Sequence, residues 1–222
     1  MKLIFKLTPI FLIAIWASVV FAGQGYWLSF PKKSQPAKKW MEKHDWHSKR
    51  GDPDHWTVED GILKMVSDDD SVMIGTTRGF PLDAKSHRKL RFEAAIDRLP
   101  KGATIRAKST DDAAFRIYIM FDKGGGWFTP PETLGYVWDN NTEPGSFVPS
   151  NHFDNVKRVV IGSGATVTGQ FIKFERDIVD DYRHAFKRKK IPMIAGVGVK
   201  CDSNHTDDKA ASRLKFISLS AK

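Results

Sequence analysis

Short runs of residues that alternate between apolar and polar recur along most of this chain, and they limit its possible folds more than any other feature. About ten such runs lie between Trp56 and Leu219, and turns rich in glycine or aspartate, such as 124–126 and 68–70, separate many of them. Alternation places successive side chains on opposite faces of a strand. A series of short strands with turns between them is typical of a sandwich or a barrel. The pattern therefore predicts an all-β domain over residues 56–222, built as an antiparallel β-sandwich.

One segment, residues 177–187, departs from this alternation. Its apolar residues recur at the spacing of one face of a helix: Ile178, Tyr182, Ala185 and Phe186. Aspartates occupy its first turns and the basic run 187–190 follows its end, an order that suits the helix dipole. The sequence predicts one short helix near residues 177–187 that covers an end or an edge of the sheets.

The first 22 residues have the pattern of a secretory signal peptide. Two lysines precede the apolar run Leu7–Val20, and small residues around Ala22 offer a cleavage site. The run is shorter than the ~20 apolar residues that a bilayer span requires. We therefore expect cleavage, a periplasmic or secreted protein, and no transmembrane segment in the mature chain.

Residues 23–55 differ in composition from the rest of the chain. They are polar, rich in lysine and tryptophan, and contain Pro31, Pro36 and Pro53. Such a composition is typical of a segment with little regular structure. We therefore expect three parts: a signal peptide (1–22), an irregular N-terminal segment (23–55) and the sandwich domain (56–222).

The basic surplus of the chain indicates an anionic partner. The formal net charge of +9 falls to +7 when the two lysines of the signal peptide are removed. An exported basic protein is expected to meet a glycan or another anionic component of the cell envelope, and not nucleic acid. The charge is concentrated in runs at 32–33, 38–39 and 187–190, which are also typical of the solvated ends of elements.

Cys201 is the only cysteine, so no disulfide can form within the chain. It follows the apolar stretch 194–199. We therefore expect a small buried residue there and not a nucleophile.

Motifs of known catalytic and cofactor sites are absent from the sequence. It contains no P-loop, dinucleotide fingerprint, HExxH or GxSxG. We predict no cofactor and no metal site, because His44, His47 and His55 lie in the polar segment, which lacks regular structure to hold ligands in place. Acidic turns such as 68–70 leave calcium binding open.

One enzymatic alternative rests on paired carboxylates. Glu175 together with Asp122 or Asp177 would supply the two carboxyl groups that hydrolyse a glycosidic bond. The opposing interpretation is that Glu175 forms an ion pair with Arg116 or Arg176, while Asp177 caps the helix.

The segment Phe115–Asp122 carries the clearest candidate binding residues. Its odd-numbered positions are apolar and must face a core, so Arg116, Tyr118 and Asp122 face the other way. A surface of this kind is suited to holding a ligand.

Two later segments add polar and aromatic candidates. Tyr136 and Trp138 share one face of a following strand, and Glu175-Arg176 precede the helix. Because successive strands often lie side by side, we predict that these side chains converge on one ligand site. Its predicted members are Arg116, Tyr118, Asp122, Tyr136, Trp138, Glu175 and Arg176. The alternative is that the cluster seals the helix against the sheet.

Four ordered motifs carry a resemblance to a known family. They are FRIYIMFD, TLGYVWDNN, FERDIVDDYRHAF and IAGVGVKCDSNHT. In this order they resemble the bacterial domain of unknown function 3047 family, over roughly residues 45–220. Phe171 and Cys201 depart from the family pattern. The resemblance implies an exported β-sandwich and no particular activity.

A second likeness is at the level of the fold. Residues 56–63 are similar to the opening hairpin of concanavalin-like and other jelly-roll carbohydrate proteins. The hypothesis that follows is an exported, non-catalytic binding protein of the cell envelope whose ligand is a carbohydrate. The alternatives are a glycan-cleaving hydrolase with paired carboxylates and a partner protein in envelope assembly.

Overall fold

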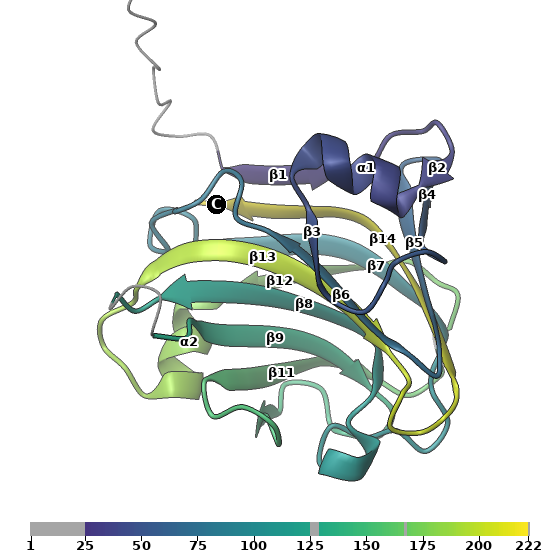
Figure 1. Cartoon of the computed structure of the whole chain (residues 1–222). Helices are drawn as coiled ribbons and strands as arrows, with labels where there is room; N and C mark the ends of the chain where they lie inside the picture. Colours follow the sequence, from purple (N-terminus) through teal and green to yellow (C-terminus); the bar gives the residue numbers. More distant parts are fainter. Residues whose placement is uncertain (1–24, 125–128, 167, 222) are drawn as a thin grey trace, which may run out of the picture.

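Two β-sheets packed face to face form the body of the molecule in the computed structural model (Figure 1). The structure describes residues 25–124, 129–166 and 168–221. The predicted signal peptide, residues 1–22, lies outside these ranges.

The first sheet has the strand order β12-β7-β14-β5-β4-β2, and β1 also pairs with β14. Its strands are β1 (Tyr26–Ser29), β2 (Gln35–Pro36), β4 (Thr57–Glu59), β5 (Ile62–Asp68), β7 (Lys89–Arg98), β12 (Ile172–Asp177) and β14 (Lys209–Ser220).

The second sheet has the strand order β10-β11-β9-β8-β13-β6-β3. Its strands are β3 (His47–Arg50), β6 (Ser71–Thr76), β8 (Ala113–Asp122), β9 (Glu132–Asp139), β10 (Phe147–Pro149), β11 (Val156–Ser163) and β13 (Met193–Asp202). The pair β9–β11 is parallel, whereas the other pairings among the described strands are antiparallel. The exception arises because the chain between β9 and β11 first forms the edge strand β10, which then pairs antiparallel with β11.

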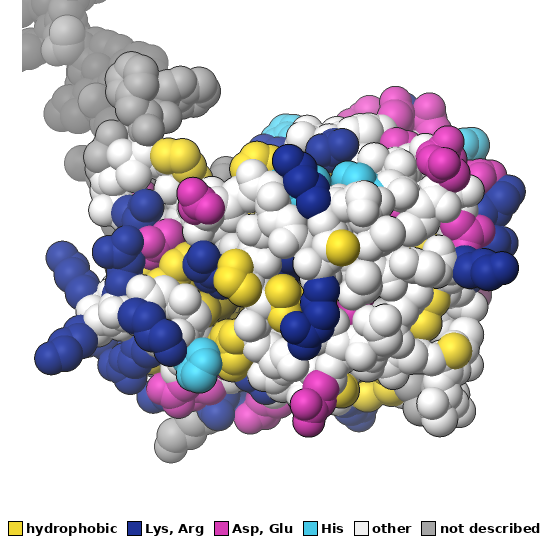
Figure 2. Space-filling view, turned by 90° about the horizontal axis from the view of Figure 1, so that it is seen from below, with side chains coloured by type: hydrophobic (Ala, Val, Ile, Leu, Met, Phe, Trp, Pro, Cys, Tyr) yellow, Lys and Arg dark blue, Asp and Glu magenta, His cyan; other side chains and the backbone are white. Residues whose placement is uncertain are grey.

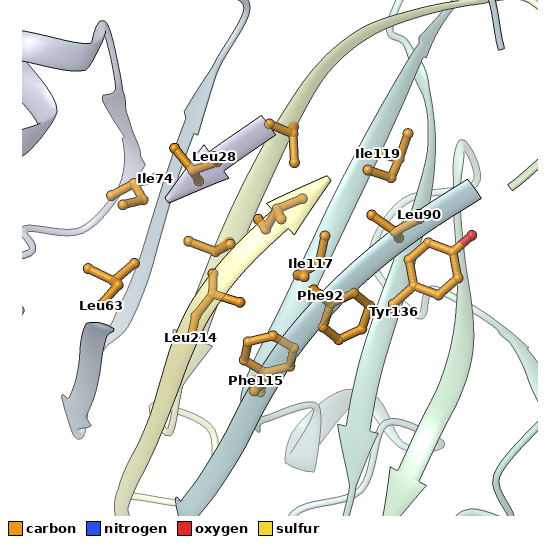
Figure 3. Close-up of a cluster of buried hydrophobic side chains, with 14 of the residues drawn as sticks. Leu28, Leu63, Ile74, Leu90, Phe92, Phe115, Ile117, Ile119, Tyr136 and Leu214 are labelled. Carbon is orange, nitrogen blue, oxygen red and sulfur yellow. The ribbon is translucent and has the colours of Figure 1, made fainter. Parts of the chain in front are cut away.

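The core lies between the two sheets, as the alternation predicts. Phe115, Ile117 and Ile119 on β8 are fully buried, and they lie near Leu90 and Phe92 of β7 (Figure 3). Full burial of each such side chain contributes about 1.5–3 kcal/mol. The antiparallel β-sandwich predicted from the sequence is therefore confirmed.

The predicted helix is present as α2 (Ile178–Phe186). The Asp177 carboxylate accepts hydrogen bonds from the backbone N–H groups of Val179 (3.2 Å) and Asp180 (3.3 Å), which satisfies two donors at the helix start. At the other end Lys187 adopts a left-handed conformation (φ 55°), and its N–H donates to the Arg183 carbonyl.

The expectation of an irregular segment over residues 23–55 is wrong for its described part. It contains β1, β2, the helix α1 (Ala37–His44) and β3. The reason is that Trp40 and Met41 of α1, together with Trp46, are buried in the main core, while Lys39 stays exposed. A second helix and a short 3-10 turn, η1 (Lys108–Thr110), thus accompany the predicted one.

Cys201 is fully buried on β13, and burial raises the pKa of its thiol well above the ordinary value. This position fits the expected small core residue. Neither described helix has the length and apolar character needed to span a membrane.

Candidate functional site

The outer face of the second sheet, which points away from the core, is hollowed along one row of paired residues. Gly75 of β6 pairs with Gly198 of β13, and Gly198 pairs with Tyr118 of β8. Tyr118 in turn pairs with Gly135 of β9, and Gly135 with Arg158 of β11. Because three of these five positions have no side chain, the row forms a floor and not a ridge.

The ring of Tyr118 occupies the space above Gly135. A Cβ atom at position 135 would lie 2.9 Å from Cε1 and 3.2 Å from Cδ1 of that ring, closer than real Cβ contacts allow. Tyr118 is only 8% exposed, although it faces away from the core. Gly135 therefore lets the tyrosine ring lie across the neighbouring strand.

A groove of about 440 Å³ opens over this floor, and we call it the β8 groove. The strands that form it lie in front in Figure 1. Among the residues that the structure describes, its lining combines basic with apolar and aromatic side chains and includes no aspartate or glutamate: Lys49, Arg50, Met73, Tyr118, Met120, Thr133, Phe153, Val156 and Lys200. Phe153, at the edge of the groove, is 61% exposed.

The cations of the β8 groove are largely uncompensated. Lys49 and Arg50 are exposed at the end of β3, and no carboxylate of the described residues lies within 4.0 Å of either. Lys200 is half-buried and forms an ion pair with the buried carboxylate of Asp202 at 2.5 Å. The groove therefore favours a ligand with negative charge.

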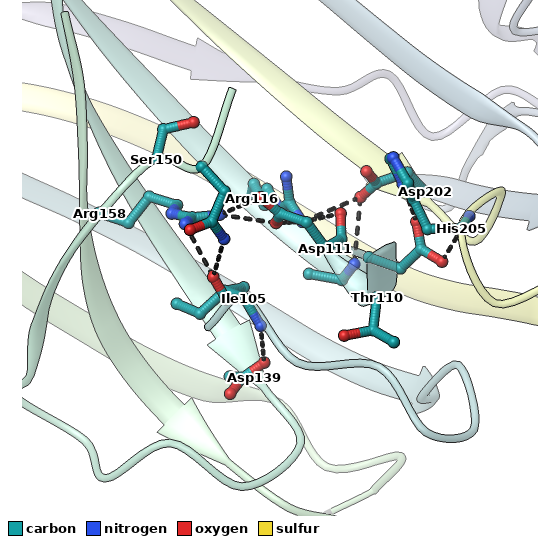
Figure 4. A network of polar contacts seen from close by, with 12 residues as sticks. Ile105, Thr110, Asp111, Arg116, Asp139, Ser150, Arg158, Asp202 and His205 are labelled. Atoms are coloured by element: carbon teal, nitrogen blue, oxygen red, sulfur yellow. Dashed lines mark hydrogen bonds and ion pairs between the residues drawn. The ribbon is translucent and has the colours of Figure 1, made fainter. Parts of the chain in front are cut away.

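A buried ionic network lies beside the groove (Figure 4). The Asp111 carboxylate accepts hydrogen bonds from Nη1 of Arg158 at 2.6 Å and from Nη2 of Arg116 at 2.9 Å. Arg116 also lies 3.5 Å from Asp202 and donates a weak hydrogen bond to the Tyr118 hydroxyl. The network thus connects the tyrosine of the floor to a rigid set of charges.

The two arginines of this network respond differently to burial. Burial alone would lower the pKa of Arg116, but the carboxylates of Asp202 and Asp111 outweigh it and the pKa is raised. For Arg158 burial prevails over the attraction of Asp111, and the pKa is lowered. The Asp111 carboxylate is thus held between two guanidinium groups.

The predicted convergence of seven residues is wrong, because the two strands β8 and β9 place them on opposite faces. Tyr136 pairs with Ile117, a core residue, so Tyr136 and Trp138 point into the core. The Trp138 ring packs edge-on against Phe174, and its Nε1 donates to the Gly164 carbonyl at 3.0 Å. Arg116 and Tyr118 face the other way, and of the seven only these two lie together in or beside the β8 groove.

Tyr136 and Arg176 meet at the helix instead. The Tyr136 hydroxyl donates to Asp181 of α2 at 3.0 Å, and the Arg176 guanidinium binds the same carboxylate through Nε (3.0 Å) and Nη2 (2.5 Å). Burial, followed by the charge of Asp181, raises the pKa of Tyr136 well above its ordinary value. For these two residues the geometry is that of the alternative interpretation, in which the cluster seals the helix against the sheet.

Glu175 lies on the first sheet, where it pairs with neither of the expected arginines. Its carboxylate accepts from Nε of Arg91 at 2.7 Å and lies 3.5 Å from Lys89, which also approaches Asp177 at 3.6 Å. The hydrogen bond from Arg91 lowers the pKa of Glu175. Burial would raise the pKa of Asp177, but the hydrogen bond from Arg88 outweighs it and the pKa is lowered.

Both carboxylates are therefore held in the ionised form. A glycosidase needs one carboxyl group whose pKa is raised, so that it can protonate the leaving group. Asp122, the other proposed partner, is exposed at the end of β8 and accepts a hydrogen bond from the backbone N–H of Gly124 at 2.8 Å. The pairing of Glu175 with Asp177 therefore does not supply such an acid.

Sequence reasoning missed most of the residues that line the β8 groove. Lys49 and Arg50 lie in the segment expected to be irregular. Lys200 lies near the end of β13, and the sequence does not show which strands pair with β13. One signal was available: isolated glycines within strand patterns, at 75, 135 and 198, mark places where another group approaches the backbone closely.

Comparison with protein families agrees with the resemblance carried by the four motifs. The model described as "Protein of unknown function (DUF3047)" matches residues 38–218. The chain belongs to the DUF3047 family. All strands of the β8 groove lie within the part of the chain that the DUF3047 model matches.

Several solved structures are similar to this DUF3047 chain at low sequence identity. A thermo-stable cellulase derived from that of Rhodothermus marinus has a TM-score of 0.45 and 10% identity, with 88% of this chain and 100% of that chain covered. A cleaved adhesin domain of Lys-gingipain from Porphyromonas gingivalis has a TM-score of 0.39 and 13% identity, with 90% and 99% covered. A xyloglucanase from Bacillus licheniformis has a TM-score of 0.37 and 10% identity, with 88% and 97% covered. A search of curated proteins finds no match.

Proposed function

We propose that this protein is an exported, non-catalytic binding protein whose β8 groove holds an anionic glycan. The observation that carries the proposal is the composition of the groove lining, which has three cations and no acid within the described part of the chain. Carboxylate, sulfate or phosphate groups on a sugar chain would pair with Lys49, Arg50 and Lys200. Export is supported by the signal-peptide pattern of residues 1–22.

A sugar chain suits the remaining surface of the β8 groove. The ring of Tyr118 lies at the floor and that of Phe153 is exposed at the edge. Aromatic rings pack against the apolar faces of sugars, and nearby polar groups then set the orientation of the ligand. Met73 and Met120 add apolar surface that adapts to irregular shapes.

The same lining supports binding without chemistry. Hydrolysis of a glycosidic bond requires two carboxyl groups on either side of that bond. The carboxylates nearest the groove in the ionic network, Asp111 and Asp202, are each bound by an arginine or a lysine. Both side chains are buried in these ion pairs and neither lines the groove.

The experiment is a binding titration by calorimetry on the chain that starts at Gly23. The probes are polygalacturonate, an anionic polysaccharide, and neutral galactan. We expect binding of polygalacturonate only, and a loss of at least about tenfold, or ~1.4 kcal/mol, in the double variant Lys49→Gln/Arg50→Gln.

The matched control is Lys32→Gln/Lys33→Gln, which removes the same charge from an exposed turn away from the groove. An equal loss of affinity in the control, or equal binding of both polysaccharides, would contradict the proposal. New reducing ends in the polygalacturonate sample would contradict its non-catalytic part.

A further inference from the structure

The loop that joins α2 to β13 carries the densest basic run of the chain, Lys187–Lys190. This loop lies at the outer left edge of the molecule in Figure 1. In Figure 2 basic side chains gather at the same end, with hydrophobic side chains next to them. The β8 groove does not include any of these residues.

Three of the four cations in this run have no ion-pair partner in the described ranges. Arg188 binds the buried carboxylate of Glu132 through Nε (2.9 Å) and Nη2 (2.7 Å). Lys187, Lys189 and Lys190 are exposed, and no carboxylate of the described residues lies within 4.0 Å of them. The ion pair of Arg188 anchors the loop, while the three lysines project positive charge into solvent.

Apolar surface adjoins these lysines. A hollow of about 540 Å³ beside the loop is lined by Arg188, Lys190, Ile191, Pro192 and Met193, and on its other side by Lys123 and the exposed Asp122. Met193 is 42% exposed. Ile191 and Pro192 are partly buried, so Met193 is the exposed apolar side chain of this group. Lysines next to exposed apolar surface favour binding to a bilayer, since lysines meet lipid phosphates and apolar side chains enter the headgroup region.

We infer that the α2–β13 loop docks this protein on an anionic lipid bilayer. Charge complementarity favours this occupant: three exposed lysines on an outer loop, without a carboxylate partner among the described residues and next to the exposed Met193, match a negatively charged surface of wide area. The docking surface is separate from the β8 groove. Met193 and Lys200 lie seven residues apart on the extended strand β13, which corresponds to roughly 23 Å.

The test is co-sedimentation of the chain from Gly23 with vesicles, because the apolar run of residues 7–20 would itself enter lipid. The described fold begins at residue 25 and is retained whole in this chain. Vesicles of phosphatidylglycerol and phosphatidylcholine (one to three) are compared with vesicles of phosphatidylcholine alone. We expect binding to the anionic vesicles only, weakened by added salt.

The decisive variant is Lys187→Gln/Lys189→Gln/Lys190→Gln. Each lysine near an anionic surface strengthens binding by roughly fivefold, so this variant should bind roughly 100-fold more weakly. The control Lys32→Gln/Lys33→Gln/Lys39→Gln removes three exposed lysines from the β1–β2 turn and α1, and should change binding by less than about threefold. Both variants should keep the melting temperature of the parent and its affinity for polygalacturonate.

Three results would overturn the inference. They are failure of the parent to bind anionic vesicles, an equal loss in both variants, and retention of vesicle binding by the loop variant. Loss of polygalacturonate binding in the loop variant, with vesicle binding unchanged, would assign the loop to the glycan instead. The proposed function of the β8 groove is tested by different residues and a different probe, so either can fail alone.

Discussion

The substitution Gly135→Ala tests whether the ring of Tyr118 lies over the backbone of β9. The added Cβ would approach Cε1 of the ring to 2.9 Å, against 3.4 Å for an ordinary contact, so the ring must move by about 0.5 Å or more. Overpacking of this kind costs about 1–3 kcal/mol. Alanine also restricts the backbone of the unfolded chain more than glycine does, and this stabilises the folded protein by about 0.4–1 kcal/mol. We expect a net loss of about 1–2 kcal/mol in the free energy of unfolding.

A double-mutant cycle isolates this contact. In the Tyr118→Ala background the ring is gone, and Gly135→Ala should stabilise the protein by about 0.4–1 kcal/mol. The coupling between the two positions should therefore be about 1–3 kcal/mol, measured by urea denaturation of the four proteins. A coupling below about 0.5 kcal/mol would refute the placement of the ring and with it the floor of the β8 groove.

Three further predictions concern stability. Trp138→Ala should destabilise the protein by about 3–5 kcal/mol in urea denaturation, as expected of a core aromatic residue, while the folded protein keeps its affinity for polygalacturonate. Normal melting together with lost binding would contradict the placement of Trp138 in the core. Asp111→Ala should lower the free energy of unfolding by about 3–5 kcal/mol, because it leaves the buried Arg158 without its carboxylate partner. A decrease below about 1 kcal/mol would show that the ionic network is not buried as described. The pKa of Asp177 is lowered in the folded protein, so its ion pair with Arg88 stabilises the fold above the ordinary carboxyl pKa of about 3.9, and this stabilisation is lost as the pH falls through the folded pKa. Asp177→Asn should therefore be less stable than the parent at pH 6, and its stability should decline less on acidification. Parallel curves of the unfolding midpoint against pH for the two proteins would contradict this.

The sequence predicts those parts of the fold that depend on local patterns. Alternation along Phe115–Asp122 identifies the core face of β8 because the side-chain period of a strand is two. The helix α2 is predicted within one residue at each end, because its apolar spacing and the cap at Asp177 are both local signals. The helix α1 is missed because it spans only eight residues, with three lysines next to the buried Trp40 and Met41.

The site could not be predicted in the same way, because it depends on register between distant strands. Knowing that Tyr136 and Trp138 share a face does not show which face it is. That depends on the pairing of Tyr136 with Ile117, and a shift of one residue would turn both rings outward. Likewise, Lys49 and Lys200 become neighbours only through the pairing of β3 and β13 with β6.

The most direct test of the central claim is a nuclear magnetic resonance titration of the ¹⁵N-labelled chain from Gly23 with a short oligogalacturonate. The side chains nearest to Gly75, Gly135 and Gly198 are Lys49, Tyr118 and Met73, which line the β8 groove, so the backbone amides of the three glycines serve as internal reporters. We predict that these amides shift together with that of Lys200, and that the amides of β14 on the first sheet do not. Saturable shifts confined to the first sheet, with the three glycines unchanged, would contradict the account.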